Sequence, residues 1–236
     1  MMLGARTAAW AKSGYTAKDY IQDGLIAMWD GIENAGWGVH DPNATTWKDL
    51  VGGVEASNTY YGIYEWKPNA LVLPGINGHS LSFTLQNLTD AVNQNNVSVE
   101  CVFKPEHGTA TGNNAIFGFG IYQRILWIWG AAMTTIRGSG KKQSQDFITD
   151  GVVNVITYSG GNIYKNGFLH GVASIGTETA TENIGQIGQI SNYYSAIGNY
   201  TSLCGDVHSI RVYNRNITPA EIVANYAIDK ARFNLP

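Results

Sequence analysis

The sequence is short of charge. Only 14% of its 236 residues are Asp, Glu, Lys or Arg, whereas globular domains average about 25%. The net charge is −3, and the densest basic stretch is the pair Lys141-Lys142. Nucleic-acid binding needs a cluster of cations facing the phosphates, so we expect no nucleic-acid partner.

Cysteine and long apolar runs are also scarce. The two cysteines make no disulfide framework. Cys101 shares a strand face with Val97, Val99 and Phe103, which predicts a buried free thiol, whereas a bridge to Cys204 would require the two strands to adjoin. No run approaches the length of a membrane span, and the first residues lack the apolar core of a secretory signal. We expect no membrane partner, and expect any exterior location to be reached within a particle, as part of a longer protein or by a signal-free route.

Turn formers and strand patterns are plentiful. The segment NVSVECVFKP (96–105) alternates apolar and polar residues, which is typical of a strand with one buried face. Residues 115–133 and 152–171 each predict a hairpin, and in the second the pair Asn166-Gly167 suits a two-residue turn. Turn signals recur every eight to twelve residues or so, the rhythm of an all-β sandwich or barrel. We predict one domain over 24–236.

The two ends of the chain differ from this pattern. Residues 1–23 are Ala-rich and predict an arm that packs on the domain or docks onto a neighbouring subunit. At the other end, Thr218 is a good helix N-cap, Pro219 suits the first helical position, and Glu221 completes a capping box. We expect this to be the only helix, with an apolar stripe of Ile222, Val223 and Tyr226 lying on a sheet.

Three segments carry a family resemblance. GDVHSIRVYNR (205–215) leads directly into NITPAEIVANY (216–226), while NIYKNGFLHG (162–171) and the opening segment at 24–53 precede them in order. Together they resemble laminin-G-like domains of the concanavalin A-like lectin/glucanase superfamily, especially versions encoded by gut bacteria and their phages. The resemblance implies a two-sheet antiparallel jelly-roll sandwich that binds glycans or proteins. Some relatives bind calcium, and one branch hydrolyses glucans.

Glucan hydrolysis is the least favoured of these activities. A retaining glycosidase needs two carboxylates about 5 Å apart, which sandwich glucanases place on one strand at alternating positions. Here Glu100 is the one acid within a clear strand, and its neighbours two positions away are Ser98 and Val102. The glycine-rich 138–144 lacks the residues of a phosphate loop, and no Gly-x-Ser-x-Gly elbow is present. We therefore predict that the chain is not an enzyme.

The stretch 30–50 leaves two interpretations open. Asp30, Asp41 and Asn43 offer oxygen ligands of the kind that calcium prefers, so a calcium ion is one interpretation. Asp41-Pro42-Asn43 is also ordinary turn chemistry, in which the Asp side chain bonds its own backbone, and this is the favoured one.

Aromatic residues give the best-supported chemistry. Sugars bind aromatic rings through their C–H faces, while polar side chains bind the hydroxyls. Trp29 and Trp47 are predicted to lie in the core. The candidates for carbohydrate contact are Trp37, His40, Tyr60, Tyr61, Trp66, Tyr193 and Tyr194.

The sequence therefore predicts a non-catalytic carbohydrate-recognition module in a phage particle or bacterial surface assembly, at the virion or cell surface. The alternative is a structural or decorating virion protein that forms homo-oligomers, or contacts virion neighbours, through residues 1–23.

Overall fold

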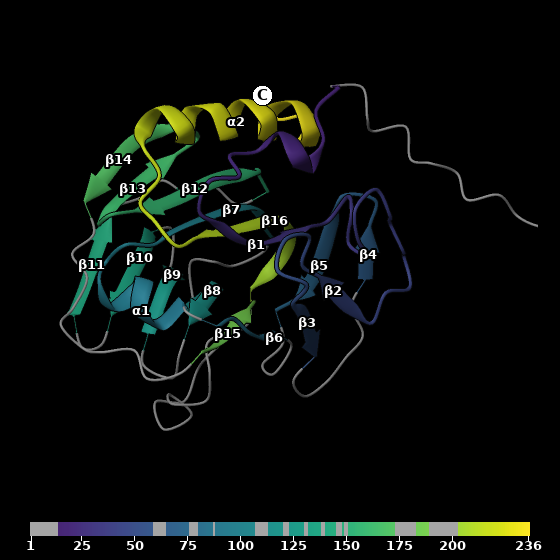
Figure 1. Cartoon of the computed structure of the whole chain (residues 1–236), viewed down its shortest axis with the longest axis horizontal. Helices are drawn as coiled ribbons and strands as arrows, with labels where there is room; N and C mark the ends of the chain where they lie inside the picture. Colours follow the sequence, from purple (N-terminus) through teal and green to yellow (C-terminus); the bar gives the residue numbers. More distant parts are fainter. Residues whose placement is uncertain are drawn as a thin grey trace, which may run out of the picture.

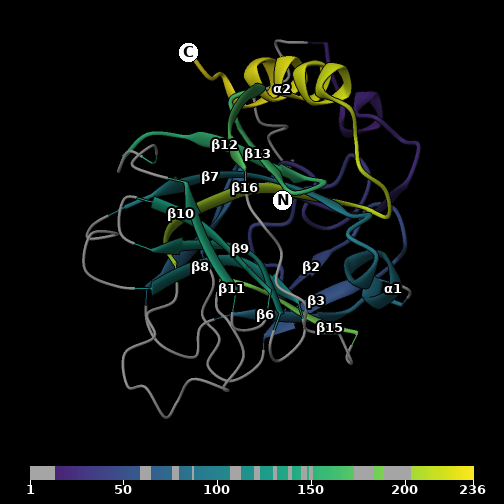
Figure 2. The same ribbon diagram turned by 90° about the vertical axis from the view of Figure 1, so that its left-hand side faces the viewer.

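The computed structural model describes residues 14–58, 65–75, 80–86, 88–106, 113–119, 123–129, 132–137, 140–144, 148, 151–172, 183–188 and 203–236. Two antiparallel sheets lie face to face, and the helix α2 (Pro219–Phe233) crosses the outer face of one of them (Figures 1 and 2). The predicted all-β two-sheet sandwich with a C-terminal helix is confirmed.

The first sheet is centred on the longest described strand, β16 (Cys204–Tyr213). One edge of β16 pairs with β7 (Ser98–Pro105) along its length, and the other edge is shared end to end by β5 (Ala70–Pro74) and β1 (Leu25–Asp30). The remaining strands of this sheet are β4 (Glu65–Lys67) beyond β5, and then β12 (Asn154–Ser159), β13 (Asn162–Lys165) and β14 (Phe168–Val172) beyond β7.

The second sheet is built mostly from the middle of the chain. Its order is β11 (Gly140–Ser144), β10 (Ala132–Arg137), β9 (Gln123–Trp129), β8 (Asn113–Phe119), β15 (Ile184–Ile187), β6 (Leu81–Thr84), β3 (Glu55–Asn58) and β2 (Thr46–Lys48). Both predicted hairpins form, β8 with β9 and β12 to β14. Asn166 and Gly167 have φ of 51° and 83°, the left-handed values that a tight hairpin turn requires.

The space between the sheets is filled by large apolar side chains. Trp29 and Trp47 are fully buried there, as predicted, and the Trp29 ring lies 4.5 Å from that of Phe83, centroid to centroid. Cys101 is a buried thiol in the same core, also as predicted. It pairs in register with Ile210, whereas Cys204 lies six residues earlier on β16, so the two cysteines are not bridged even though their strands adjoin.

The strand β7 departs from the prediction of one buried face. Nearly all of its residues are buried, including the polar Ser98 and Glu100 on the side away from the core. The reason is α2, which covers the outer face of the first sheet (Figure 2). Period-two alternation correctly separated the two faces of this strand, but it could not show that both are covered.

The helix α2 begins as predicted. Thr218 Oγ1 accepts from the backbone N–H of Glu221 at 3.3 Å, and Glu221 Oε2 accepts from that of Thr218 at 2.7 Å, which completes the capping box. The predicted apolar stripe is wrong at Val223, which is 48% exposed. The face that is buried carries Ile222, Asn225, Ile228, Asp229, Arg232 and Phe233.

A second helix, α1 (Leu88–Asn93), was not expected. Its six residues are too few to show a helical period in the sequence. None of the helices in the described part of the chain combines the length and apolarity that a membrane crossing requires.

Part of the predicted arm is described. Residues 14–23 carry the short 3-10 helix η1 (Ala17–Asp19) and run beside α2 (Figure 1). Ala17 and Tyr20 are buried against the same domain. The segment 14–23 therefore packs on its own chain, while 1–13 lies outside the described residues.

Candidate functional site

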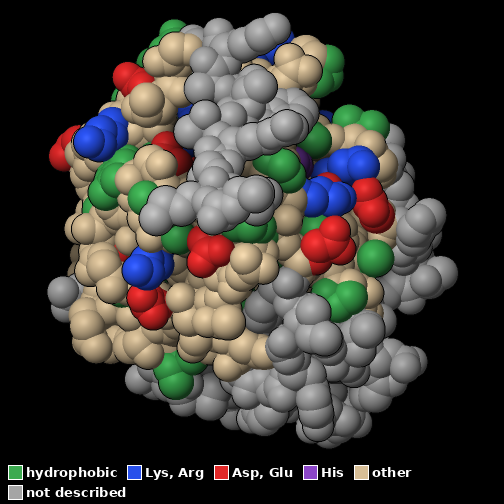
Figure 3. All heavy atoms as spheres, turned by 90° about the vertical axis from the view of Figure 1, so that its right-hand side faces the viewer, with side chains coloured by type: hydrophobic (Ala, Val, Ile, Leu, Met, Phe, Trp, Pro, Cys, Tyr) green, Lys and Arg blue, Asp and Glu red, His purple; other side chains and the backbone are tan. Residues whose placement is uncertain are grey.

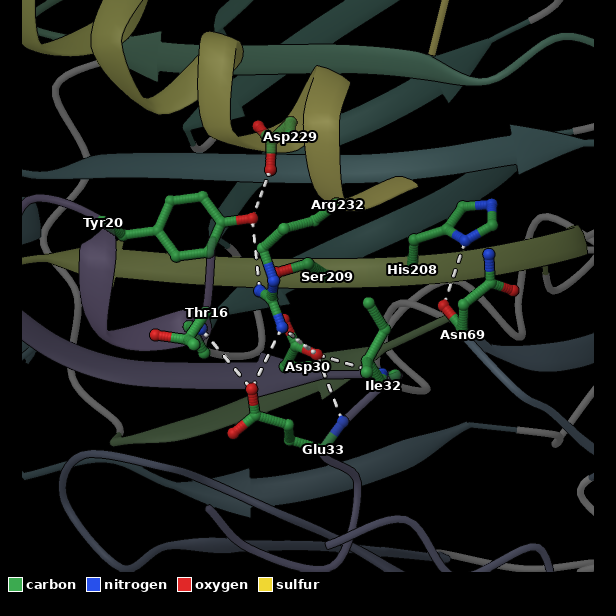
Figure 4. Close-up of polar contacts among 12 residues, drawn as sticks. Thr16, Tyr20, Asp30, Ile32, Glu33, Asn69, His208, Ser209, Asp229 and Arg232 are labelled. Atoms are coloured by element: carbon green, nitrogen blue, oxygen red, sulfur yellow. Dashed lines mark hydrogen bonds and ion pairs between the residues drawn. The ribbon is translucent and has the colours of Figure 1, made fainter. Parts of the chain in front are cut away.

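The loop 31–45, between β1 and β2, is held where it leaves β1. Asp30 is fully buried, and its Oδ1 accepts from the backbone N–H groups of Ile32 at 2.9 Å and Glu33 at 3.2 Å. Arg232 on α2 forms an ion pair with the same carboxylate at 2.6 Å (Figure 4). A Cβ on Gly31 would lie 2.6 Å from the carbonyl oxygen of Asn69, so only glycine fits where the loop passes β5.

A second buried carboxylate holds the tip of the loop. Glu33 Oε2 accepts from the backbone N–H of Gly38 at 2.8 Å. Its Oε1 accepts from Arg232 at 3.1 Å and, more weakly, from the backbone N–H of Ala17 at 3.4 Å (Figure 4). One side chain therefore joins the loop tip to both η1 and α2.

Trp37 stands at that tip. The backbone N–H of Val39 donates to the carbonyl of Gly36 at 2.9 Å, and Gly38 has a φ of 70°, which makes Gly36–Val39 a turn that needs glycine at its third position. The Trp37 side chain is 40% exposed, and the ammonium of Lys18 on η1 lies 5.3 Å from its ring centroid. A large aromatic ring is thus presented outward on a backbone that is tied down.

His40 lies on the same loop and is partly buried. Its Nδ1 is 3.1 Å from the carbonyl oxygen of Gly31. A carbonyl can only accept, so Nδ1 carries a proton, and in the neutral ring Nε2 is then the acceptor. The ring therefore offers a hydrogen-bond acceptor beside the exposed loop tip.

The turn interpretation of 41–43 is confirmed. Asp41 Oδ1 accepts from the backbone N–H of Asn43 at 2.9 Å, and the side chain of Asn34 bonds both the N–H and the C=O of Asp41, each at 2.8 Å. The Asp30 carboxylate is paired with the guanidinium of Arg232. Among the residues the structure describes, no three His, Cys, Asp or Glu side chains gather as a metal site would require.

The other aromatic candidates fall into two groups. Trp66 is only 8% exposed, because it lies in β4 with its ring edge-on to Trp47 at 5.3 Å, and its Nε1 donates to the carbonyl of Ala44 at 2.9 Å. Its ring is therefore not presented at the surface, and it instead supports the end of the loop 31–45. The remaining candidates, Tyr60, Tyr61, Tyr193 and Tyr194, lie outside the described residues.

Sequence reasoning missed a buried polar network beneath α2. Arg211 on β16 donates to Glu100 on β7 at 3.0 Å and to Asp229 on α2 at 2.9 and 2.7 Å. The Tyr20 hydroxyl donates to Asp229 at 2.7 Å, and its ring centroid lies 4.0 Å from the Arg211 guanidinium carbon. Asn225 adds a hydrogen bond to Glu100 at 2.6 Å. The only sequence signal was the presence of charged residues in otherwise apolar segments, and it did not indicate which residues pair.

Burial sets the proton affinities in this network. It raises the pKa of the Glu100 carboxyl, and the Arg211 guanidinium beside it opposes that rise. It raises the pKa of the Tyr20 hydroxyl well above its usual value, so the tyrosine stays a donor to Asp229. For Arg211, burial lowers the pKa, but Asp229 and Glu100 outweigh it and leave the guanidinium charged. The ion pairs of Arg211 with Glu100 and Asp229 join β7, β16 and α2.

Two face-to-face antiparallel sheets with a helix across the outer face of one of them define a two-sheet β-sandwich. Among solved structures, the chain is similar to the Trypanosoma rangeli sialidase in complex with sialic acid, with a TM-score of 0.61 and 15% identity over 88% of this chain and 33% of that one. It is also similar to the receptor-binding domain of botulinum neurotoxin type G, with a TM-score of 0.57 and 14% identity over 88% of this chain and 52% of that domain.

The chain thus spans about a third of the sialidase and about half of the receptor-binding domain. No family model matches the sequence, and no curated protein matches it either. At these identities the likeness shows the fold alone, and a fold does not determine which activity its loops carry.

Proposed function

We propose that this chain is a non-catalytic carbohydrate-recognition module whose loop 31–45 contacts a surface glycan or polysaccharide through Trp37. The observation that carries the proposal is the exposed Trp37 ring at the tip of a turn whose backbone is anchored by Glu33. Indole rings bind the C–H faces of sugars, and polar groups beside them bind the hydroxyls, a role for which His40 offers Nε2.

The anchoring of the loop supports this role. Asp30 holds its start, Glu33 holds its tip and Asn34 holds its return through Asp41. A loop that is already ordered loses little conformational freedom when it binds, so more of the contact energy appears as affinity. One of the similar structures is a sialidase in complex with sialic acid, and this chain matches about a third of it.

The proposed setting is a phage particle or a bacterial surface assembly, at the virion or cell surface. This part of the proposal rests on the resemblance of residues 24–53, 162–171 and 205–226 to laminin-G-like domains encoded by gut bacteria and their phages.

The non-catalytic part of the proposal is supported by the way the buried acids are used. Glu100 accepts from Arg211 beneath α2, and Asp30 and Glu33 both bind Arg232. None of the three is poised as an acid or nucleophile beside a sugar. Incubation with a polysaccharide panel should release no reducing ends; release from any member would contradict this part of the proposal.

Glycan titration tests the binding role. Trp37→Ala should weaken the binding of any glycan ligand at least tenfold, a loss of about 1.4 kcal/mol. Phe168→Ala is the matched control, because it removes another exposed aromatic ring from the distant strand β14 and should leave affinity unchanged. If host cell-wall glycans do not bind at millimolar concentrations, or if Trp37→Ala binds as the parent does, the proposal is wrong.

A second candidate function, a homo-oligomeric structural protein, is favoured by β14. This strand ends the first sheet and exposes Phe168 by 72%, Leu169 by 62% and Val172 by 66%. Exposed apolar side chains on an edge strand are typical of an association surface. Leu169→Lys places a charge on this surface, so the mass of the oligomer in solution should fall toward that of the monomer. A parent chain that is monomeric at every concentration would exclude this candidate.

Deleting residues 1–13 tests the predicted contribution of the arm to the same assembly. Residues 14–23 should be kept, because Tyr20 belongs to the buried network and its removal would affect the stability of the domain itself.

A further inference from the structure

We propose that Lys18 makes the Trp37 site selective for sugars that carry a carboxylate. This inference rests on the proposed function of the loop 31–45 and names the class of ligand for that same site. It assigns the described part of the N-terminal arm to the binding site rather than to assembly.

The backbone that carries Lys18 is fixed. Thr16 caps η1 and accepts from the backbone N–H of Lys18 at 3.3 Å, while the Asp19 carboxylate accepts from the N–H of Thr16 at 2.6 Å and from its hydroxyl at 2.9 Å. These hydrogen bonds from Thr16 lower the pKa of Asp19. The acid next to Lys18 in the sequence is therefore used by the cap.

The residues that follow anchor η1 to α2. Tyr20 is buried, with its hydroxyl donating to Asp229 (Figure 4). The backbone N–H of Ile21 donates to Asn225 Oδ1 at 3.0 Å. Ala17 contacts Glu33, which also holds the Trp37 turn. The backbones of Lys18 and Trp37 are thus held by the same buried residues, and these contacts keep the two side chains close together.

Lys18 is exposed, and no acid among the described residues forms an ion pair with it. Elsewhere Lys67 pairs with Asp206 and Lys104 with Glu106, each at 2.7 Å, and cations lie beside acids on the described part of the face in Figure 3. Within the described ranges, no carboxylate lies within 4.0 Å of the Lys18 ammonium, which instead lies over the Trp37 ring. An exposed cation beside an exposed ring is the pair of groups that an acidic sugar would contact.

The selectivity follows from what a ligand must displace. A sugar that stacks on the face of Trp37 beneath the ammonium has to move Lys18 away, which removes a weak cation–π contact. A neutral sugar offers nothing in its place. A sugar with a carboxylate offers an ion pair, so the flexible lysine moves from the ring to the ligand.

The test compares a uronic-acid oligosaccharide with its carboxyl-reduced neutral counterpart, so that the two ligands differ only in the acid group. The parent chain should bind the acidic form about three- to fivefold more tightly, the size of an exposed ion pair. The preference should shrink at about 0.5 M salt, because salt screens exposed charges.

Lys18→Gln should abolish the preference, by weakening binding of the acidic form three- to fivefold or so while leaving binding of the neutral form equal or slightly tighter. Lys230→Gln is the matched control, because Lys230 also lies over an aromatic ring, 5.9 Å from the centroid of Tyr226, on α2. It should change neither affinity.

The outcomes separate the two proposals. If both forms bind equally, and Lys18→Gln has no effect while Trp37→Ala abolishes binding, the role of Lys18 is overturned and the carbohydrate-recognition function stands. If neither form nor any other glycan binds, the proposed function is wrong and the role of Lys18 falls with it.

Discussion

The two faces of the first sheet are buried in different ways. The inner face packs apolar side chains such as Val99, Phe103 and Ile210 against the second sheet. The outer face, beneath α2, buries Glu100 and Arg211. Apolar packing tolerates small changes of shape, whereas each charged group in the outer layer depends on particular partners. The outer layer is therefore the more specific of the two and the more easily broken.

The largest effect should come from Arg211→Met. It leaves the carboxylates of Glu100 and Asp229 buried without their cation, and we expect a loss of about 3–5 kcal/mol in the free energy of unfolding, measured with urea. On the inner face, Ile210→Val should cost only about 1 kcal/mol. Arg215→Met, which breaks half-exposed ion pairs, should cost less than about 1 kcal/mol. Equal losses for Arg211→Met and Ile210→Val would remove the distinction between the two faces.

Tyr20→Phe should have the next largest effect. It keeps the ring beside Arg211 but removes the hydroxyl that donates to Asp229 at 2.7 Å. A buried hydrogen bond to a charged group contributes about 2 kcal/mol, so urea unfolding should show a loss of that size. The amide of Ile21 should also exchange hydrogen faster in the variant, because the arm is less firmly held. A variant as stable as the parent would show that the ring alone holds the arm.

The free energy of unfolding should depend on pH through His208. This residue lies at the bulge of β16, between the part that pairs with β5 and the part that pairs with β1. Burial lowers the pKa of its imidazole below the usual 6.5, and within the described part of the chain its Nε2 has no hydrogen-bond partner. The unfolded chain then binds the proton more readily, so the free energy of unfolding should fall as the pH drops below 6.5, by up to about 1.4 kcal/mol per pH unit. His208→Gln should flatten this part of the profile; an unchanged profile would assign the dependence to other groups.

The smallest effect should come from the exposed start of α2. The hydrogen bond from Arg215 lowers the pKa of Glu221 from 4.5 to about 2, with Thr218 adding to it. A depressed pKa contributes stability above the unfolded value, and that contribution is lost as the pH falls from 4.5 toward 2. Because the pair lies at the surface and is partly exposed, Glu221→Gln should cost less than about 1 kcal/mol at pH 7. A larger loss in the free energy of unfolding would mean that this surface ion pair contributes as much to stability as the buried pairs of Arg211.

The elements that the sequence predicted are those specified by neighbouring residues. Thr218 and Glu221 cap α2 three positions apart, and Asn166-Gly167 forms its turn from two adjacent residues. The loop at 41–43 likewise follows from Asp41 bonding the residue two positions later. Trp37 was a candidate because it stands among turn formers, and the structure shows it exposed.

The parts that escaped prediction depend on distant partners or on very short segments. Glu100 and Arg211 are 111 positions apart, and Tyr20 and Asp229 are 209 apart, so no local pattern connects them. Val223 was assigned to the buried side of α2 because it is apolar, but the buried face runs through Ile222, Asn225 and Asp229 and leaves Val223 outside it. The burial of Trp66 depends on its contact with Trp47 in the other sheet, and α1 has only six residues, too few to leave a readable period.

The contact between Tyr20 and Asp229 also sets an order of events during synthesis. When Tyr20 leaves the ribosome, the residues that bind it are still more than 200 positions away. Arg211 and Glu100 likewise lack their partners on α2 until that helix has been synthesised, so the outer layer cannot be completed before then. The contacts that hold the arm on the domain can therefore form only after α2 has been synthesised, later than the pairing of strands that are close in sequence can begin.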